Sequence, residues 1–192
     1  MRYAPYDELN VIRERVSGTM SSGLLNVQEK RNEIGDIVFE YLTWAYLYGV
    51  EDANEAFGTD ILSEPLQMVD TIYKTIDGQD FRDRIDKYVT EDGADIDSIV
   101  RIAETEMTRD YNTGVYDAGK SIESATGMKV GKKWITMMDG RVRDTHDFLH
   151  GVVVGIDEAF TTFDGDSAMA PGGFELPENN INCRCFITLS HL

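Results

Sequence analysis

The residues with the richest chemistry gather in the last third of the chain. The chain has two cysteines, Cys183 and Cys185, and two of its three histidines, His146 and His150, precede them. Thiolate and imidazole are the ligands that zinc prefers, and structural zinc sites usually have four ligands. One interpretation is therefore a zinc site of His146, Cys183 and Cys185, with His150 or Asp139 as the fourth ligand.

A second interpretation needs no metal, because a Cys-x-Cys pair is less usual for zinc than a Cys-x₂-Cys pair. The cysteines would then be small apolar residues at the start of a strand, and His146 a buried, hydrogen-bonded histidine. In that case we expect a buried polar network that anchors a long loop to a strand through charge-assisted hydrogen bonds. The members of that network would be Asp139, Arg141, Arg143 and His146.

Catalysis is a third interpretation of the same residues. His146, with Cys183 or Cys185 as the nucleophile, has the residue types of a cysteine hydrolase. Arg143 beside His146 has those of a nuclease acting on phosphate. The sequence shows no glycine-rich phosphate loop and no sign of oxyanion donors. We therefore expect no catalytic residue and no enzyme activity, with a hydrolase or nuclease as the alternative.

The first half of the chain has the periodicity of helices. Apolar residues spaced three and four apart predict a helix over residues 24–48. The run Ser63-Glu64-Pro65 is a helix start signal, and the apolar pattern after it continues to Gly78.

Two further helices are predicted before the character of the chain changes. A short helix begins at Asp80. Another is capped by Asp95 or Asp97, and it ends near Gly119 or continues toward Ala125.

Polar residues on this last helix have ordinary explanations. We expect Asn112 and Lys120 to be surface or capping residues. At least one of Glu104 and Glu106 should be solvated, because both lie within the helix.

After Gly127 the pattern changes to that of short strands and loops. Residues 130–138 are predicted as a strand, 143–149 as a short helix and 185–189 as a closing strand. Residues 164–180 contain glycine, proline, four acids and no basic residue, so we expect a loop that is mobile unless something pins it.

The predicted fold is therefore α+β. A helical N-terminal half is followed by a small mixed α/β module with a few-stranded sheet and a long loop. The helical region would cover residues 1–127, and the C-terminal module would cover residues 128–192.

Composition narrows the range of functions. The 192 residues carry 18 basic and 35 acidic side chains, a net charge of −17, so contact with DNA is disfavoured. The sequence contains neither a run of roughly 20 apolar residues nor a signal peptide at its start, so we expect no membrane contact. A disulfide between cysteines one residue apart would be strained, so we expect synthesis in a reducing cytoplasm.

The ordered set of motifs resembles the phage Mu protein F-like family, the minor head or head morphogenesis proteins of tailed bacteriophages. The resemblance covers roughly residues 99–188. It rests on Lys132-Lys133-Trp134, the run from Asp139 to His146, Leu149-His150-Gly151, Phe160 and Asn182-Cys183-Arg184-Cys185, with Thr105-Glu106 and Asn112 upstream. The positions that match the family are Trp134, Asp139, Arg141, Arg143, His146, Gly151, Asn182, Cys183, Arg184 and Cys185.

The resemblance implies a minor capsid protein of the virion, inside the head and near the portal. Its partners would be the portal protein, the major capsid protein or both, with self-association as a further expectation and the helical region as the contacting part. His150 departs from the family pattern, where an acidic or small polar residue is expected.

The resemblance also bears on further domains and on a rival function. Family members also occur fused to toxin domains, and we expect none here because the sequence ends seven residues after Cys185. A host-directed binding protein of a prophage is the second alternative.

Overall fold

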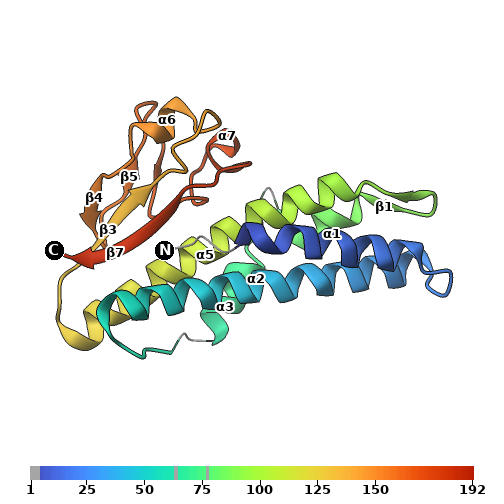
Figure 1. Ribbon diagram of the computed structural model, residues 1–192, viewed down its shortest axis with the longest axis horizontal. Coiled ribbons are helices and arrows are strands. Elements are labelled where there is room, and N and C mark those ends of the chain that lie inside the picture. The colour runs from blue at the N-terminus through green and yellow to red at the C-terminus, as the bar shows by residue number, and fades with distance from the viewer. Residues whose placement is uncertain (1–4, 63–64, 77) are drawn as a thin grey trace.

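The computed structural model describes residues 5–62, 65–76 and 78–192, and its fold is α+β as predicted (Figure 1). An elongated helical body carries a small sheet module on one side of its long central helix. The body comprises α1 (Pro5–Ser21), α2 (Val27–Phe57), α3 (Pro65–Ile72), α4 (Phe81–Asp86), the hairpin β1 (Val89–Thr90) and β2 (Gly93–Ala94), and α5 (Ile96–Thr126). The module comprises β3 (Val130–Ile135), α6 (Asp144–Asp147), β4 (Val153–Gly155), β5 (Phe160–Thr161), β6 (Ser167–Ala168), α7 (Pro177–Asn180) and β7 (Phe186–His191).

Local capping signals set the ends of the two longest helices. Asn26 and Glu29 form a capping box at the start of α2, and Gly58 ends it in the left-handed conformation. The helix predicted over 24–48 is thus confirmed and extends to Phe57. Asp95, one of the two predicted caps, begins α5, and Gly127 at φ 72° ends it, so the longer of the two predicted ends is correct.

Helices α2 and α5 cross at a point where only glycine fits. A Cβ on Gly49 would lie 2.2 Å from the carbonyl oxygen of Tyr111. A Cβ on Gly114 would lie 2.1 Å from the carbonyl oxygen of Tyr46. The backbones of α2 and α5 are therefore in direct contact at these two glycines. Buried apolar residues of both helices pack against each other along the rest of the interface.

Several predicted boundaries in the helical body differ from the structure. Helix α3 begins at Pro65, as the start signal predicts, although Ser63 and Glu64 lie outside the described residues. It ends at Ile72 rather than near Gly78. The sequence reasoning also missed α1 and the β1–β2 hairpin, since neither carries a strong periodic signal.

The module is built on a three-stranded antiparallel sheet in the order β4-β3-β7. Strand β3 is central, with Trp134 opposite Ile187 of β7, and it ends at Ile135 rather than at the predicted Met138. Strand β7 is an edge strand and packs on α5, where Gly119 contacts Leu189. Strands β5 and β6 form a separate two-stranded ribbon.

One hydrophobic core runs from the helical body into the module. It includes Ile12 and Leu42 of the body as well as Phe160 and Ile187 of the module. Because α5 packs against both parts, the division into residues 1–127 and 128–192 stays a prediction. Over the described ranges, no helix combines the length and apolarity needed to cross a bilayer.

Candidate functional site

The structure brings His146, Cys183 and Cys185 together in a thiol–imidazole cluster. The Nδ1 atom of His146 lies 3.4 Å from the Sγ of Cys183 and 3.6 Å from the Sγ of Cys185. All three side chains are buried, and their potential ligand atoms lie within 4.8 Å of one another. The second ring nitrogen of His146, Nε2, is buried and has no hydrogen-bond partner among the described residues.

The backbone before β7 explains why a Cys-x-Cys spacing works here. Asn182 has a positive φ of 57°, a conformation that Asn tolerates better than most residues, and it turns the chain into the strand. In extended backbone, residues two apart project to the same side. Both sulfurs therefore face His146, while Arg184 between them reaches the other way to Asp139.

Aromatic rings fix the imidazole from two sides. The ring of Trp134 meets His146 edge-on, with centroids 5.5 Å apart, and the ring of Phe174 stacks on it at 5.4 Å. Trp134 is completely buried in β3, so the sheet core forms one wall of the cluster. The cluster is thus sealed by side chains from β3, from α6 and from the predicted long loop.

The two thiols are electrostatically unequal. The pKa of Cys183 is lowered well below its usual value, first by the hydrogen bond from Cys185 and also by the bond to His146. The pKa of Cys185 is raised, first by its bond to Cys183 and then by burial. Cys183 is therefore the thiol that carries negative charge more readily.

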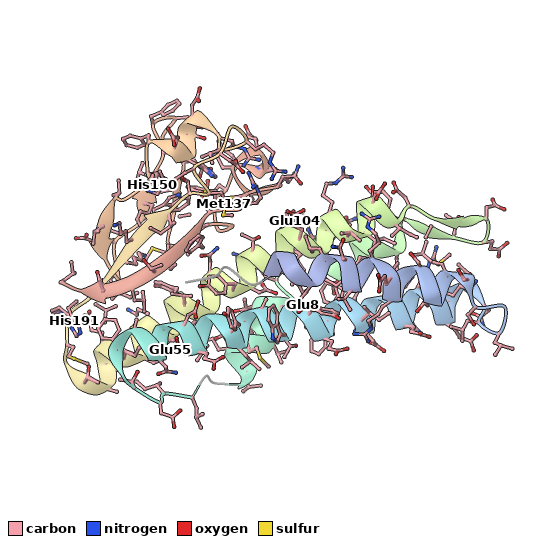
Figure 2. The ribbon with its side chains drawn as sticks, viewed as in Figure 1. Glu8, Glu55, Glu104, Met137, His150 and His191 are labelled. Carbon is pink, nitrogen blue, oxygen red and sulfur yellow. The ribbon has the colours of Figure 1, made fainter. Side chains whose placement is uncertain are left out.

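Neither residue predicted as a fourth ligand lies in the cluster. Helix α6 ends at Asp147, short of the predicted end at residue 149, so His150 does not share a helix with His146. The Nδ1 of His150 instead accepts a hydrogen bond from the backbone N–H of Thr136 at 3.1 Å. His150 and His191 lie at separate ends of the module (Figure 2).

Asp139 is engaged elsewhere, in an ion pair near the surface. Its carboxylate accepts two hydrogen bonds from Arg184, at 2.6 and 2.8 Å. This bidentate pair, together with the backbone N–H of Arg141, lowers the pKa of Asp139 to about 2. The contact ties the turn after β3 to the segment before β7.

The predicted anchoring network therefore exists in part, but it is not buried. The side chain of Arg141 is 77% exposed and lies 3.7 Å from Asp139. Arg143 donates to the carbonyl oxygen of Ile181. Gly151, with a φ of 81°, donates its N–H to the carbonyl of Trp134 at 2.8 Å. Of the four predicted network residues, only His146 is fully buried, because it packs between α6 and the sheet. Asp139, Arg141 and Arg143 lie nearer the surface of the module.

Asp166 pins the loop predicted over 164–180, and sequence reasoning missed it. Its buried carboxylate accepts four N–H groups: the backbone N–H of Ser167, Glu175 and Leu176, and the side-chain amide of Asn179. These bonds keep the pKa of Asp166 below its usual value despite burial. The loop is therefore ordered around one carboxylate and contains β6 and α7.

Asn112 was predicted as a surface or capping residue, and that prediction is wrong. It is fully buried in the middle of α5. Its carboxamide donates to the carbonyl of Cys185 at 3.1 Å and accepts from the N–H of Ile187 at 2.9 Å. Asn112 thus takes the place of a neighbouring strand at the open edge of β7. Lys120 is exposed, as predicted, and pairs with Asp157.

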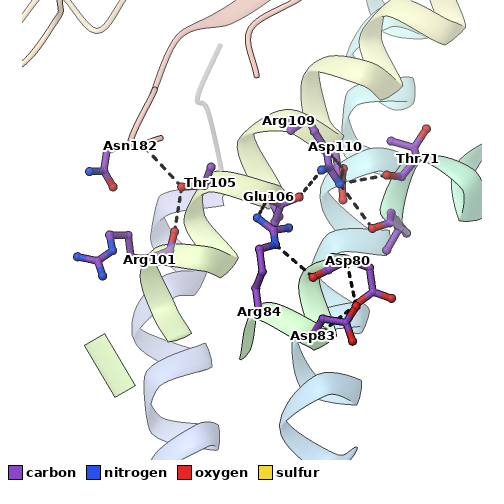
Figure 3. A network of polar contacts seen from close by, with 11 residues as sticks. Thr71, Asp80, Asp83, Arg84, Arg101, Thr105, Glu106, Arg109, Asp110 and Asn182 are labelled. Carbon is purple, nitrogen blue, oxygen red and sulfur yellow. Dashed lines mark hydrogen bonds and ion pairs between the residues drawn. The ribbon is translucent and has the colours of Figure 1, made fainter. Parts of the chain in front are cut away.

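A second buried network lies in the helical body (Figure 3). Glu106 pairs with Arg84 at 2.8 Å and with Arg109, and Arg109 also pairs with Asp110 at 3.0 Å. Of the two glutamates of which at least one was predicted to be solvated, Glu106 is buried and Glu104 is half-buried. Burial raises the pKa of Asp110 to about 7, although Arg109 opposes the shift.

Polar contacts on α5 reach both α3 and the module. Arg109 donates to the backbone carbonyl of Thr71 at 3.0 Å, which joins α5 to α3. One helical turn before Arg109 on α5, the hydroxyl of Thr105 accepts from the backbone N–H of Asn182 at 3.5 Å (Figure 3). The turn that positions the two cysteines therefore rests on α5.

Comparisons with known proteins found one family model and two curated relatives that match parts of this chain. The family model of the phage Mu protein F-like proteins matches residues 68–188. NAD(+)--arginine ADP-ribosyltransferase EFV of Enterococcus faecalis is 36% identical over 89 residues, 45% of this chain and 17% of that protein. Minor head protein GP7 of Bacillus phage SPP1 is 32% identical over 63 residues, 33% of this chain and 20% of that protein. The matches thus span about a fifth or less of the curated relatives' lengths. No solved structure matches the chain.

Proposed function

The chain belongs to the phage Mu protein F-like family, and from that membership we propose that it is a minor head protein of a tailed bacteriophage. The match carries this proposal because it covers more than half of the chain, from α3 to β7. The likeness to Minor head protein GP7 supports it. The role is structural: the protein is a component of the virion head, inside the shell and next to the portal.

The likeness to an ADP-ribosyltransferase does not favour an enzyme. The aligned segment is 17% of that protein, so its activity does not transfer to this chain. A shared segment within a longer transferase is what the toxin fusions implied by the family resemblance would produce. The buried thiol–imidazole cluster also offers a peptide or phosphate substrate little access.

The helical body offers a surface for a head partner on α3. Leu66 is 80% exposed, and Val69 one helical turn later is also exposed. Leu62, just before the helix, is 85% exposed. Exposed apolar side chains grouped on the surface of a protein mark interaction sites, so we propose that this face of α3 contacts the portal protein. The net charge of −17 favours a protein partner over DNA.

The experiment is co-expression of the chain with the portal and major capsid proteins of its phage, followed by purification of assembled particles. We expect the wild-type chain in the particles and at least tenfold less of the double variant Leu66→Asp/Val69→Asp. Leu24→Asp is the matched control, because Leu24 is 95% exposed in the turn between α1 and α2.

Each outcome bears on a different part of the proposal. Equal incorporation of the double variant and the wild type would remove α3 as the contact surface and leave the head role intact. Absence of the wild-type chain from assembled particles would overturn the head role itself. Circular dichroism of the purified variants checks that both remain folded.

A further inference from the structure

In the thiol–imidazole cluster, the imidazole nitrogen lies at the distance from each sulfur that a bound zinc ion requires. In a tetrahedral zinc site, bonds of about 2.0 Å to nitrogen and about 2.3 Å to sulfur place those two atoms about 3.5 Å apart. The separations from His146 Nδ1 to the sulfurs of Cys183 and Cys185 are 3.4 and 3.6 Å. All three ligand atoms lie within 4.8 Å of one another, so the cluster is already gathered around one point.

We infer that His146, Cys183 and Cys185 form a metal site that takes one zinc ion. The donor set decides the class of ion, because two sulfurs and an imidazole suit zinc and poorly suit magnesium or calcium, which prefer oxygen. This inference goes beyond the proposed function, which holds with or without a metal.

A small hollow lies beside the cluster, where the protein offers no fourth ligand among the described residues. Neither His150 nor Asp139 reaches the cluster, and the described residues supply no other candidate beside it. The hollow is lined by His146, Cys185, Met137 and Arg143, among others, and is about the size that one water molecule needs. This hollow is where a water molecule would supply the fourth ligand.

The proposed ion has a structural consequence. It would link His146 of α6 to the two cysteines before β7. This link would add to the hydrogen bonds that the segment already makes with Arg143, Asp139, Thr105 and Asn112. Three protein ligands and one water also make up catalytic zinc sites. The zinc-loaded protein is therefore the form on which the hydrolase alternative should be assayed.

The first test uses the wild-type chain, purified through a tag without histidine and never exposed to chelator. After incubation with excess zinc and desalting, we expect about one zinc per chain by elemental analysis. Replacement by cobalt(II) should give the intense near-ultraviolet absorption of thiolate-to-metal charge transfer. Less than roughly 0.1 zinc per chain, or cobalt bound without that absorption, would overturn the inference and leave a hydrogen-bonded cluster.

Variants identify the ligands. We expect Cys183→Ser and Cys185→Ser to lower bound zinc at least tenfold, while His150→Gln, a histidine outside the cluster, keeps it. If a serine variant fails to fold, the wild-type protein supplies the answer: a chelator should remove the zinc and lower its melting temperature, and added zinc should restore both. Zinc retained in folded Cys183→Ser, or a melting temperature that the chelator leaves unchanged, would count against the site.

Discussion

The helical body and the C-terminal module solve the same problem, that of burying polar groups, in different ways. In the body, Glu106 and Arg109 lie in one ion-pair network within a large apolar interface between long helices. In the module, single side chains satisfy backbone groups one by one: Asp166 from the module's own loop, and Asn112 from α5. The difference follows from element length, because strands of two to six residues bury little apolar surface. Stability is therefore spread along helices in the body and concentrated at a few residues in the module.

The largest expected effect tests the body at its closest crossing. Gly114→Val should lower the free energy of unfolding by about 3 kcal/mol, because α2 and α5 must separate to admit the side chain. Urea unfolding followed by circular dichroism measures it. Gly18→Ala is the control, since nothing lies within 4 Å of a Cβ there and alanine should stabilise α1. A Gly114→Val protein as stable as wild type would show that the crossing is looser than described.

The next effect tests the module at its loop. Asp166→Ala should lower the free energy of unfolding by about 2 kcal/mol, because it leaves buried backbone N–H groups without acceptors. Hydrogen exchange should rise over residues 164–180 and stay unchanged in α2. Glu178→Ala removes the same charge from an exposed position in the same loop and should change neither quantity. Equal exchange in both variants would mean that the loop is ordered without the carboxylate.

A smaller effect of opposite sign is expected at Lys132, which lies buried between the rings of Tyr116 and Phe160. Burial lowers the pKa of Lys132 from 10.5 to about 8. At pH 7 the lysine is therefore charged in both states, and folding carries the full cost of desolvating it. Lys132→Met should raise the free energy of unfolding by about 1 kcal/mol at pH 7.

The pH dependence of the stability difference between wild type and Lys132→Met tests whether desolvation of the charged lysine causes it. Between pH 8 and 10.5 the folded lysine loses its proton before the unfolded one does, so the wild type gains stability and the advantage of Lys132→Met should shrink. Lys133→Met, at the exposed neighbouring position, should show no such trend. A variant less stable than wild type at pH 7 would mean that the ring contacts outweigh the desolvation.

The smallest effect is expected at the rim of the module, in the ion pair of Asp139 and Arg184. Because the pKa of Asp139 is lowered from 3.8 to about 2, its stabilising contribution is complete above pH 3.8 and is lost as the pH falls through 2. The stability difference between wild type and Asp139→Asn should therefore narrow from pH 4 to pH 2. Asp147→Asn, at an exposed position of α6, is the control. A difference that stays constant over this range would remove the ion pair as its cause.

The same contrast explains what the sequence could predict. The periodicity and caps of α2 and α5 are local signals, so those helices and the α+β class were predictable. The pin at Asp166 was not, since the groups it binds lie up to 13 residues away and the loop contains three other acids. Asn112 was missed because a polar residue inside a helix usually faces water. The residue types of the cluster pointed to His146 and the cysteines. The exclusion of His150 depended on where α6 ends, and that of Asp139 on its ion pair with Arg184.

The central claim is that the chain is a component of the phage head. The most direct test is quantitative mass spectrometry of purified particles of its phage, with the portal protein as the internal standard. The account predicts the chain in particles at a fixed ratio to portal protein from one preparation to the next. Its presence in the lysate together with its absence from particles would contradict the claim and favour a host-directed or enzymatic role.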